Sequence, residues 1–281
     1  MGKMLFRIIL IGALFFCFSQ PYTGKMSAQS IAPSTQFLKI NNYYILFTTP
    51  KAPYIDKNNR YMVPLRSVND LLGGQTTFDP TSNTATIKFK THKVEFKMNS
   101  TEIVTDSIPS VMDTVPVLYK NSMFVPLGVL TKQLNIHQEW DQQNKLYSLS
   151  GKELMKTPMM ENVEDLDHFK EQVDNENAFH LLSYKLSLGE KIHLSITAKN
   201  VTRKKISEGI EDLNTTFIFS DNSTAGENRN RKRPSIDKDE MVTRDYNIDY
   251  VKTIENSKIF KNELSYIQLS YILFKGRTLK P

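Results

Sequence analysis

Residues that could bind a metal or perform acid–base chemistry are few and widely spaced. The chain has five histidines: His92, His137, His168, His180 and His193. They form no His-x-His or His-Glu-x-x-His arrangement, the spacings that place two imidazoles on one metal ion. The densest group of possible ligands is Glu164, Asp165, Asp167 and His168. Acidic residues crowded on one helix usually form a solvated face, so we favour that interpretation over a metal site.

Motifs of other enzyme classes are missing from the sequence. It contains no Gly-x-Ser-x-Gly elbow, no phosphate-binding loop and no dinucleotide fingerprint. Asp79 and Asp141 each stand at the start of a predicted turn, where an aspartate side chain usually accepts a backbone hydrogen bond. We therefore predict no catalytic, cofactor-binding or metal-binding residue and no cofactor.

The basic run from Arg229 to Arg233 could contact an anionic wall polymer or a phospholipid surface. Asp237, Asp239 and Glu240 follow it closely and weaken its field. A solvated loop is therefore the favoured interpretation.

Two further features could bind a ligand. Arg66, at the start of a predicted helix, could contact a ligand or order the neighbouring turn, and the structural role is favoured. Four tyrosines could form a saccharide-stacking patch: Tyr43, Tyr44, Tyr54 and Tyr61. Tyrosines in strands are more often half-buried packing residues, which is the competing interpretation.

The N-terminus has the layout of a secretory signal peptide. Lys3 and Arg7 precede an apolar run, 8–18, that is short for a membrane span, and small and polar residues follow it. We expect cleavage near Ala28, with an uncleaved membrane anchor as the alternative. Cys17, the single cysteine, lies in this run beside bulky phenylalanines, so we reject a lipid-attachment site.

Composition limits the remaining functional classes. The chain has 281 residues, of which 40% are hydrophobic and 23% charged, enough to bury a core. The net charge is +6, but residues 1–28 hold three basic and no acidic residues, so the rest carries 33 basic and 30 acidic residues. This near balance argues against nucleic-acid binding. The part of the chain after residue 28 has no cysteine, and a secreted protein without disulfides suggests a bacterial exported protein.

The tripeptide Val-Pro-Leu occurs twice, at 63–65 and 125–127. Fourteen residues after each proline comes a large aromatic residue, Phe78 or Trp140, and an aspartate follows it. These matches at constant spacing predict two copies of one unit, at 37–90 and 94–150.

Each predicted unit consists of hairpins around a short helix. An Asn-rich turn joins the first two strands, and a second hairpin ends in Val-Pro, because proline stops a strand and can open a helix. Apolar residues then recur at helical spacing: Leu65, Val68 and Leu71 in one copy, and Leu127, Leu130 and Leu134 in the other. Gly73 and Asn135 follow, which tolerate the left-handed conformation that ends a helix.

The motifs YMVPLRSVNDLLGG and TFDPTSNTATI resemble the copper amine oxidase N-terminal-like domain, also called the stalk domain, over residues 36–150. The second copy departs from the pattern, with Gly128 where the first has Arg66. The resemblance implies a small antiparallel sheet packed on helices and an accessory, non-catalytic role in exported proteins of Gram-positive bacteria. It does not imply copper, because the three histidines and the quinone-forming tyrosine belong to a much larger catalytic domain.

The second half of the sequence predicts a β-rich domain. Residues 151–178 are polar and acidic, and we expect a linker with a helix over 161–173. Residues 179–281 contain strand patterns at 191–201, 216–219 and 265–274, which suggest a small β-sandwich. The stretch 220–240 has almost no apolar residues, and we expect a disordered or exposed insertion there.

The expected fold is therefore α+β: a duplicated hairpin and helix unit followed by a β-rich domain. The favoured function is that of a non-catalytic exported protein of the cell envelope, a binding or scaffolding module whose partner is a cell-wall polymer or another exported protein. We expect no nucleic-acid partner, and membrane contact only through an uncleaved signal segment. The alternative is an exported enzyme or protease-inhibitor-like protein with its active surface in 179–281. His180, His193 and acids in one pocket would favour an enzyme, and a projecting loop at 220–240 an inhibitor.

Overall fold

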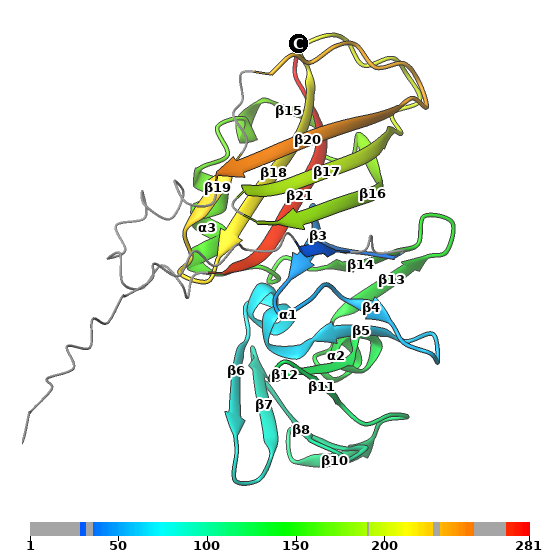
Figure 1. The fold of residues 1–281 in the computed structure, drawn as a ribbon. Coiled ribbons are helices and arrows are strands. Elements are labelled where there is room, and N and C mark those ends of the chain that lie inside the picture. The colour runs from blue at the N-terminus through cyan, green and yellow to red at the C-terminus, as the bar shows by residue number, and fades with distance from the viewer. Residues whose placement is uncertain (1–28, 32–35, 190, 227–230, 250–267) are drawn as a thin grey trace, which may run out of the picture.

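The computed structural model describes residues 29–31, 36–189, 191–226, 231–249 and 268–281 (Figure 1). The predicted signal peptide, 1–28, lies outside the described residues. Among those described, no helix combines the length and the apolar character needed to cross a bilayer.

A large mixed sheet of eight strands runs through the centre of the molecule. Its strands, in spatial order, are β13 (His137–Asp141), β14 (Leu146–Ser150), β2 (Phe37–Ile40), β3 (Tyr43–Thr48), β21 (Leu269–Leu279), β18 (Glu211–Phe219) and β19 (Thr224–Gly226), with β15 (Val173–Asn175) paired to the end of β21. The C-terminal strand β21 lies between β3 and β18 and is antiparallel to both. The two halves that the sequence suggests thus share one continuous sheet.

A second, four-stranded antiparallel sheet covers one face of the large sheet (Figure 1). Its order is β1 (Gln29–Ile31), β16 (Phe179–Leu188), β17 (Lys191–Asn200) and β20 (Met241–Asp249). The predicted alternation along 191–201 is confirmed, because Ile192, Leu194, Ile196 and Ala198 are all buried. They pack in one core with Phe217 of β18.

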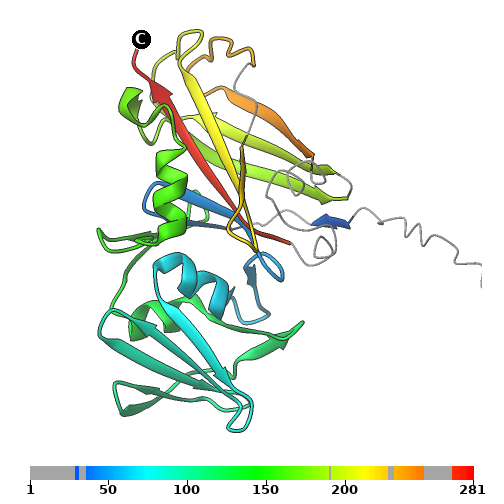
Figure 2. The same ribbon diagram turned by 90° about the vertical axis from the view of Figure 1, so that its left-hand side faces the viewer.

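The helices lie on the opposite face of the large sheet. They are α1 (Leu65–Leu72), α2 (Leu127–Gln133) and α3 (Pro158–Asp165). The predicted apolar residues of the first two helices are buried in a core that includes Ile218 of β18 and Leu273 of β21. Figure 2 shows α3 beside the large sheet, where Val163 joins the same core.

Two smaller sheets complete this side of the molecule. One has the order β11 (Val117–Tyr119), β12 (Ser122–Pro126), β5 (Tyr61–Pro64) and β4 (Tyr54–Ile55). The other is a meander of β10 (Ile108–Val111), β9 (Glu102–Thr105), β8 (His92–Lys97), β7 (Thr84–Phe89) and β6 (Gln75–Asp79). In the first sheet, Val63 is the cross-strand partner of Val125, so the two Val-Pro segments lie side by side. The fold is mostly β with a few short helices, within the expected α+β class.

The helix expected over 161–173 is placed differently. It begins earlier, because Pro158 occupies the first turn and Thr157 caps the helix by accepting a 3.1 Å hydrogen bond from the Met160 N–H. It ends at Asp165, and only a 3₁₀ turn, η1 (Lys170–Gln172), follows. The apolar spacing beyond Asp165 was misleading, because Asp167 turns into the protein while Leu166 remains 51% exposed.

Of the two alternatives expected for 220–240, a disordered or an exposed insertion, the described part fits the exposed one, because every described residue there except Ile236 is exposed or half-buried. Residues 224–226 form β19, and Ile236 is buried and pairs with Ile206 through two backbone hydrogen bonds of 2.8 and 2.9 Å. Ile236 thus attaches this polar segment to the protein core.

Candidate binding surfaces

A buried ionic cluster joins three distant parts of the chain. Arg277 of β21 donates two hydrogen bonds to the carboxylate of Asp167, of 2.7 and 2.6 Å, and a third of 2.7 Å from Nε to Asp212 of β18. Arg277 is fully buried. Burial alone would lower its pKa, but the two carboxylates outweigh that effect and raise it.

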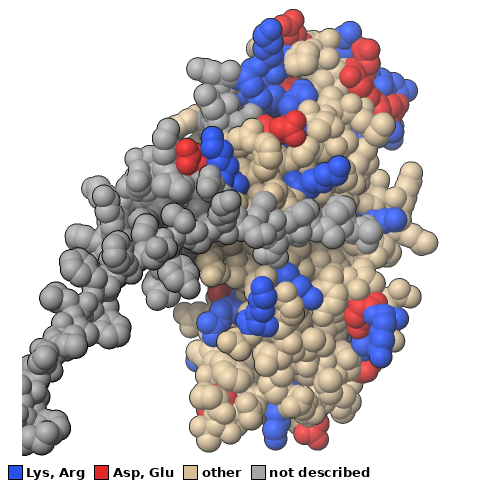
Figure 3. Space-filling view, in the orientation of Figure 1, with Lys and Arg blue, Asp and Glu red and all other residues tan. Residues whose placement is uncertain are grey.

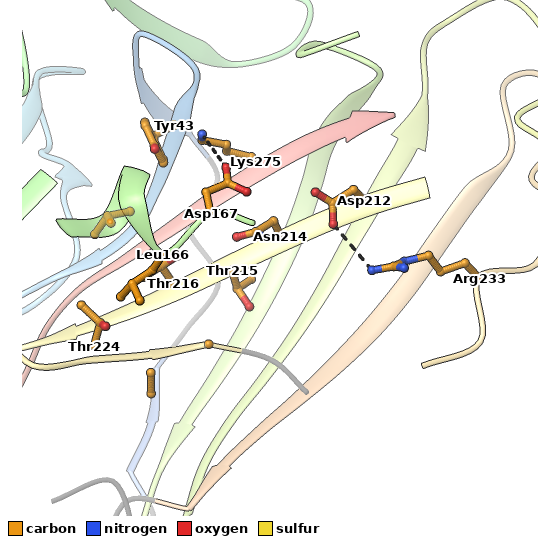
Figure 4. Close-up of a pocket in the computed structure, with 13 residues that line it drawn as sticks. Tyr43, Leu166, Asp167, Asp212, Asn214, Thr215, Thr216, Thr224, Arg233 and Lys275 are labelled. Atoms are coloured by element: carbon orange, nitrogen blue, oxygen red, sulfur yellow. Dashed lines mark hydrogen bonds and ion pairs between the residues drawn. The ribbon is translucent and has the colours of Figure 1, made fainter. Parts of the chain in front are cut away.

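A cavity of about 80 Å³ lies beside this cluster (Figure 4). Lys275 reaches it from β21, with Nζ 3.3 Å from Asp167 and 4.4 Å from the ring centre of Tyr43. Arg233 approaches from the other side, 3.9 Å from Asp212. Both carboxylates already accept hydrogen bonds from Arg277, so the cavity is lined by paired charges. We interpret it as part of the ionic contacts that hold the segment after α3 against β18 and β21.

A second buried carboxylate, Glu211, lies on the other face of β18. Arg231 donates two hydrogen bonds to it, of 2.7 and 2.6 Å, and Arg244 of β20 lies 3.3 Å away. Burial alone would raise the pKa of Glu211, but these arginines lower it. The basic run expected to be a solvated loop therefore contributes Arg231 to a buried ion pair. Arg229 lies outside the described residues.

The histidines do not assemble into one site. His180 Nδ1 lies 3.2 Å from the hydroxyl of Tyr44. His193 is exposed on β17, and its cross-strand partner is Ser187 of β16. Ser187 lies seven residues from His180 along that strand. The arrangement that would favour an enzyme is therefore not formed by these two residues.

The acidic group after α3 is also divided. Glu164, Asp165 and His168 are exposed, whereas Asp167 is buried in the ionic cluster. Within the described ranges, no group of three or more His, Cys, Asp or Glu side chains is arranged to hold a metal ion.

The two turn aspartates act as expected. Asp79 accepts a 2.9 Å hydrogen bond from the Thr81 N–H, and Asp141 accepts one of 3.0 Å from the Asn144 N–H. The hydrogen bonds of its turn, first from Ser82, lower the pKa of Asp79.

The tyrosines of the first half are packing residues rather than one exposed patch. Tyr43, Tyr44 and Tyr61 are buried, and Tyr54 is half-buried. Arg66 is exposed at the start of α1. Burial raises the pKa of Asp70 one turn later, and the charge of Arg66 partly opposes that shift.

Sequence reasoning missed a run of exposed apolar residues over 108–119, most of them on the edge strands of two different sheets, which we call the apolar edge. Its exposed side chains are Ile108 (69%), Val111 (74%), Val115, Val117, Leu118 (57%) and Tyr119. The segment contains β10 and β11, and each of these strands lies at the edge of its sheet. Strand-like apolar residues predict burial, and only the sheet order reveals that these strands have a free side.

The comparisons with known proteins identify one part of the chain. No curated protein and no solved structure matches it. A family model, described as the copper amine oxidase N-terminal domain, matches residues 39–149, from within β2 to within β14. This agrees with the motifs around the two Val-Pro segments. Residues 39–149, less than half of the chain, are therefore similar to the copper amine oxidase N-terminal domain.

Proposed function

We propose that this protein is a non-catalytic exported protein of the bacterial cell envelope that binds another exported protein. The observation that carries the proposal is the apolar edge, which lies within the non-catalytic stalk domain. The signal-like sequence of residues 1–28 supports export.

The internal repetition of the stalk domain supports an architectural role for this protein. We infer that its two hairpin and helix units are copies of one another. Asn41 and Asn99 adopt left-handed backbone conformations at matched turns, with φ of 51° and 58°. Gly73 and Asn135 do the same where α1 and α2 end, with φ of 96° and 52°. The repeated residues thus serve turns and packing, which suits a spacer or platform.

The apolar edge favours a protein partner over a wall polymer. Edge strands expose unpaired backbone groups, and soluble proteins usually protect them with charges or bulges. Apolar side chains on such an edge are typical of surfaces that receive an additional strand. A charged polymer would call for a surface of one sign, whereas the face in Figure 3 carries charges of both signs.

The test replaces Leu118 by Lys in the full-length protein, expressed with a tag in a Gram-positive host. We expect the wild type in the envelope fraction and Leu118→Lys released into the medium, because a charge on the apolar edge opposes docking. Met241→Lys is the matched control, since Met241 is about as exposed (64%) as Leu118 (57%) but lies on β20 in the second sheet. Equal retention of all three proteins would contradict the proposal.

A binding assay with purified peptidoglycan and wall polymers, at low and high salt, tests the competing partner. We expect no retention in either condition. Retention that disappears at high salt would instead assign an anionic polymer as the partner.

A further inference from the structure

Three aromatic rings of the stalk domain surround the ammonium group of Lys51. Its Nζ lies 3.6 Å from the ring centre of Tyr54, 4.6 Å from that of Tyr119 and 5.1 Å from that of Phe124. The rings come from three strands, β4, β11 and β12. The planes of Tyr54 and Tyr119 are tilted from that of Phe124 by 52° and 81°. The three side chains thus form the walls of a cage around one cation, which we call the aromatic cage.

Lys51 is held in this cage by the rings and not by an acidic partner. In the described part of the chain, no carboxylate pairs with Lys51 and no protein group accepts a hydrogen bond from its Nζ. Burial lowers its pKa. A primary ammonium has three donors and is strongly hydrated, so a cage without acceptors fits it poorly.

A quaternary ammonium group fits the same cage better. It has no N–H donor to satisfy, is weakly hydrated, and is recognised by aromatic cages through cation–π attraction. Phe124 is buried, whereas Tyr119 is 36% exposed and Tyr54 is half-buried. The cage can therefore be reached from solvent past the two tyrosines.

The backbone next to Lys51 is fixed, so its side chain can leave without unfolding the loop. The Thr49 hydroxyl donates to the Leu269 carbonyl, and the Ser67 hydroxyl donates to the Thr49 carbonyl, each at 2.5 Å. The long aliphatic stem of lysine is flexible by comparison. We propose that Tyr54, Tyr119 and Phe124 bind the trimethylammonium group of a choline-type ligand, and that Lys51 fills this site when the ligand is absent.

Lys51 would then compete with the ligand from within the molecule. A side chain tethered beside its site acts at an effective concentration of the order of millimolar, so its removal should strengthen choline binding about tenfold. The test is calorimetric titration of the purified protein with choline chloride, for the wild type and Lys51→Ala. Lys120→Ala is the matched control, because Lys120 Nζ lies 5.7 Å from the ring of Tyr119 but is not enclosed by the other two rings. We expect this control to bind choline as the wild type does.

Two further measurements distinguish cation recognition from apolar contact. The neutral isostere 3,3-dimethylbutanol should not bind to Lys51→Ala, and Tyr119→Ala added to Lys51→Ala should abolish choline binding while circular dichroism remains unchanged. The proposal is overturned if Lys51→Ala binds choline no better than the wild type, or binds the neutral isostere equally well. Sedimentation with phosphatidylcholine vesicles then distinguishes a lipid head group from a soluble or polymer-linked one.

Discussion

Arg277 and Asp167 lie 110 residues apart in sequence and are joined by two parallel hydrogen bonds of 2.7 and 2.6 Å. The pair ties the segment after α3 to the C-terminal strand, and both side chains are buried. A buried charge that loses its partner keeps its desolvation penalty, so this contact is sensitive to substitution on either side.

Replacing Asp167 by Asn should therefore destabilise the protein by about 3 kcal/mol. Asp212 remains as the second partner of Arg277 and limits the loss. Asp165→Asn is the control, because Asp165 is 79% exposed and pairs with Lys170 at 3.4 Å, an arrangement worth less than about 1 kcal/mol. Urea unfolding measures both. Equal effects of the two substitutions would refute the role of the buried pair.

Stability should decrease at acidic pH. The pKa values of Asp167 and Glu211 are lowered from 3.8 and 4.5 in the folded protein, in spite of burial, by their arginine partners. The stability that the two ionised carboxylates provide is thus fully present above their pKa values in the unfolded chain. It is lost as the pH falls through their lower pKa values in the folded protein. Urea midpoints should change little between pH 7 and about pH 5 and decrease below about pH 4. The double variant Asp167→Asn, Glu211→Gln should show a shallower decrease, and an unchanged slope would contradict this assignment.

Replacing either of two glycines by alanine should change the stability of the protein, in opposite directions. Gly73 ends α1 with a φ of 96°, and an added Cβ would lie 3.4 Å from the Lys156 carbonyl oxygen. Gly73→Ala should therefore cost about 1–2 kcal/mol. Gly128 lies within α2, and an added Cβ would meet nothing within 4 Å. Gly128→Ala should stabilise the protein by about 0.5–1 kcal/mol. Thermal unfolding checks both, and two shifts of the same sign would be the unexpected result.

The stalk domain should not be fully stable without the C-terminal strand. A fragment of residues 29–150 lacks β21, the partner of β3, and loses Leu273 and Ile218 from its core. We expect it to unfold at a lower urea concentration than the whole chain and to be cut faster by protease. A fragment as stable as the whole chain would show that the shared sheet contributes little to this part.

Local patterns predicted the local structure well. Both Val-Pro segments open a helix, the apolar residues at helical spacing are buried, and the Asn-centred turns adopt left-handed conformations. Each of these features depends on residues close in sequence.

Features that depend on distant residues were not predictable. Asp167 resembled one more acid on a solvated helix, because its partner Arg277 lies on the last strand. The apolar edge resembled buried strands, because only the sheet order shows that β10 and β11 lie at edges. The three rings around Lys51 lie 3, 68 and 73 residues further along the chain. No local sequence pattern connects Lys51 with the two distant rings.

The position of β21 also has a consequence for biosynthesis. The strand at the centre of the large sheet follows both of its neighbours in sequence, so β3 and β18 stay unjoined until residues 269–279 have been made. A product truncated before β21 would expose two long open strands in the middle of the sheet, a strong template for aggregation. Synthesis of residues 269–279 is therefore a condition for covering the open edges of β3 and β18.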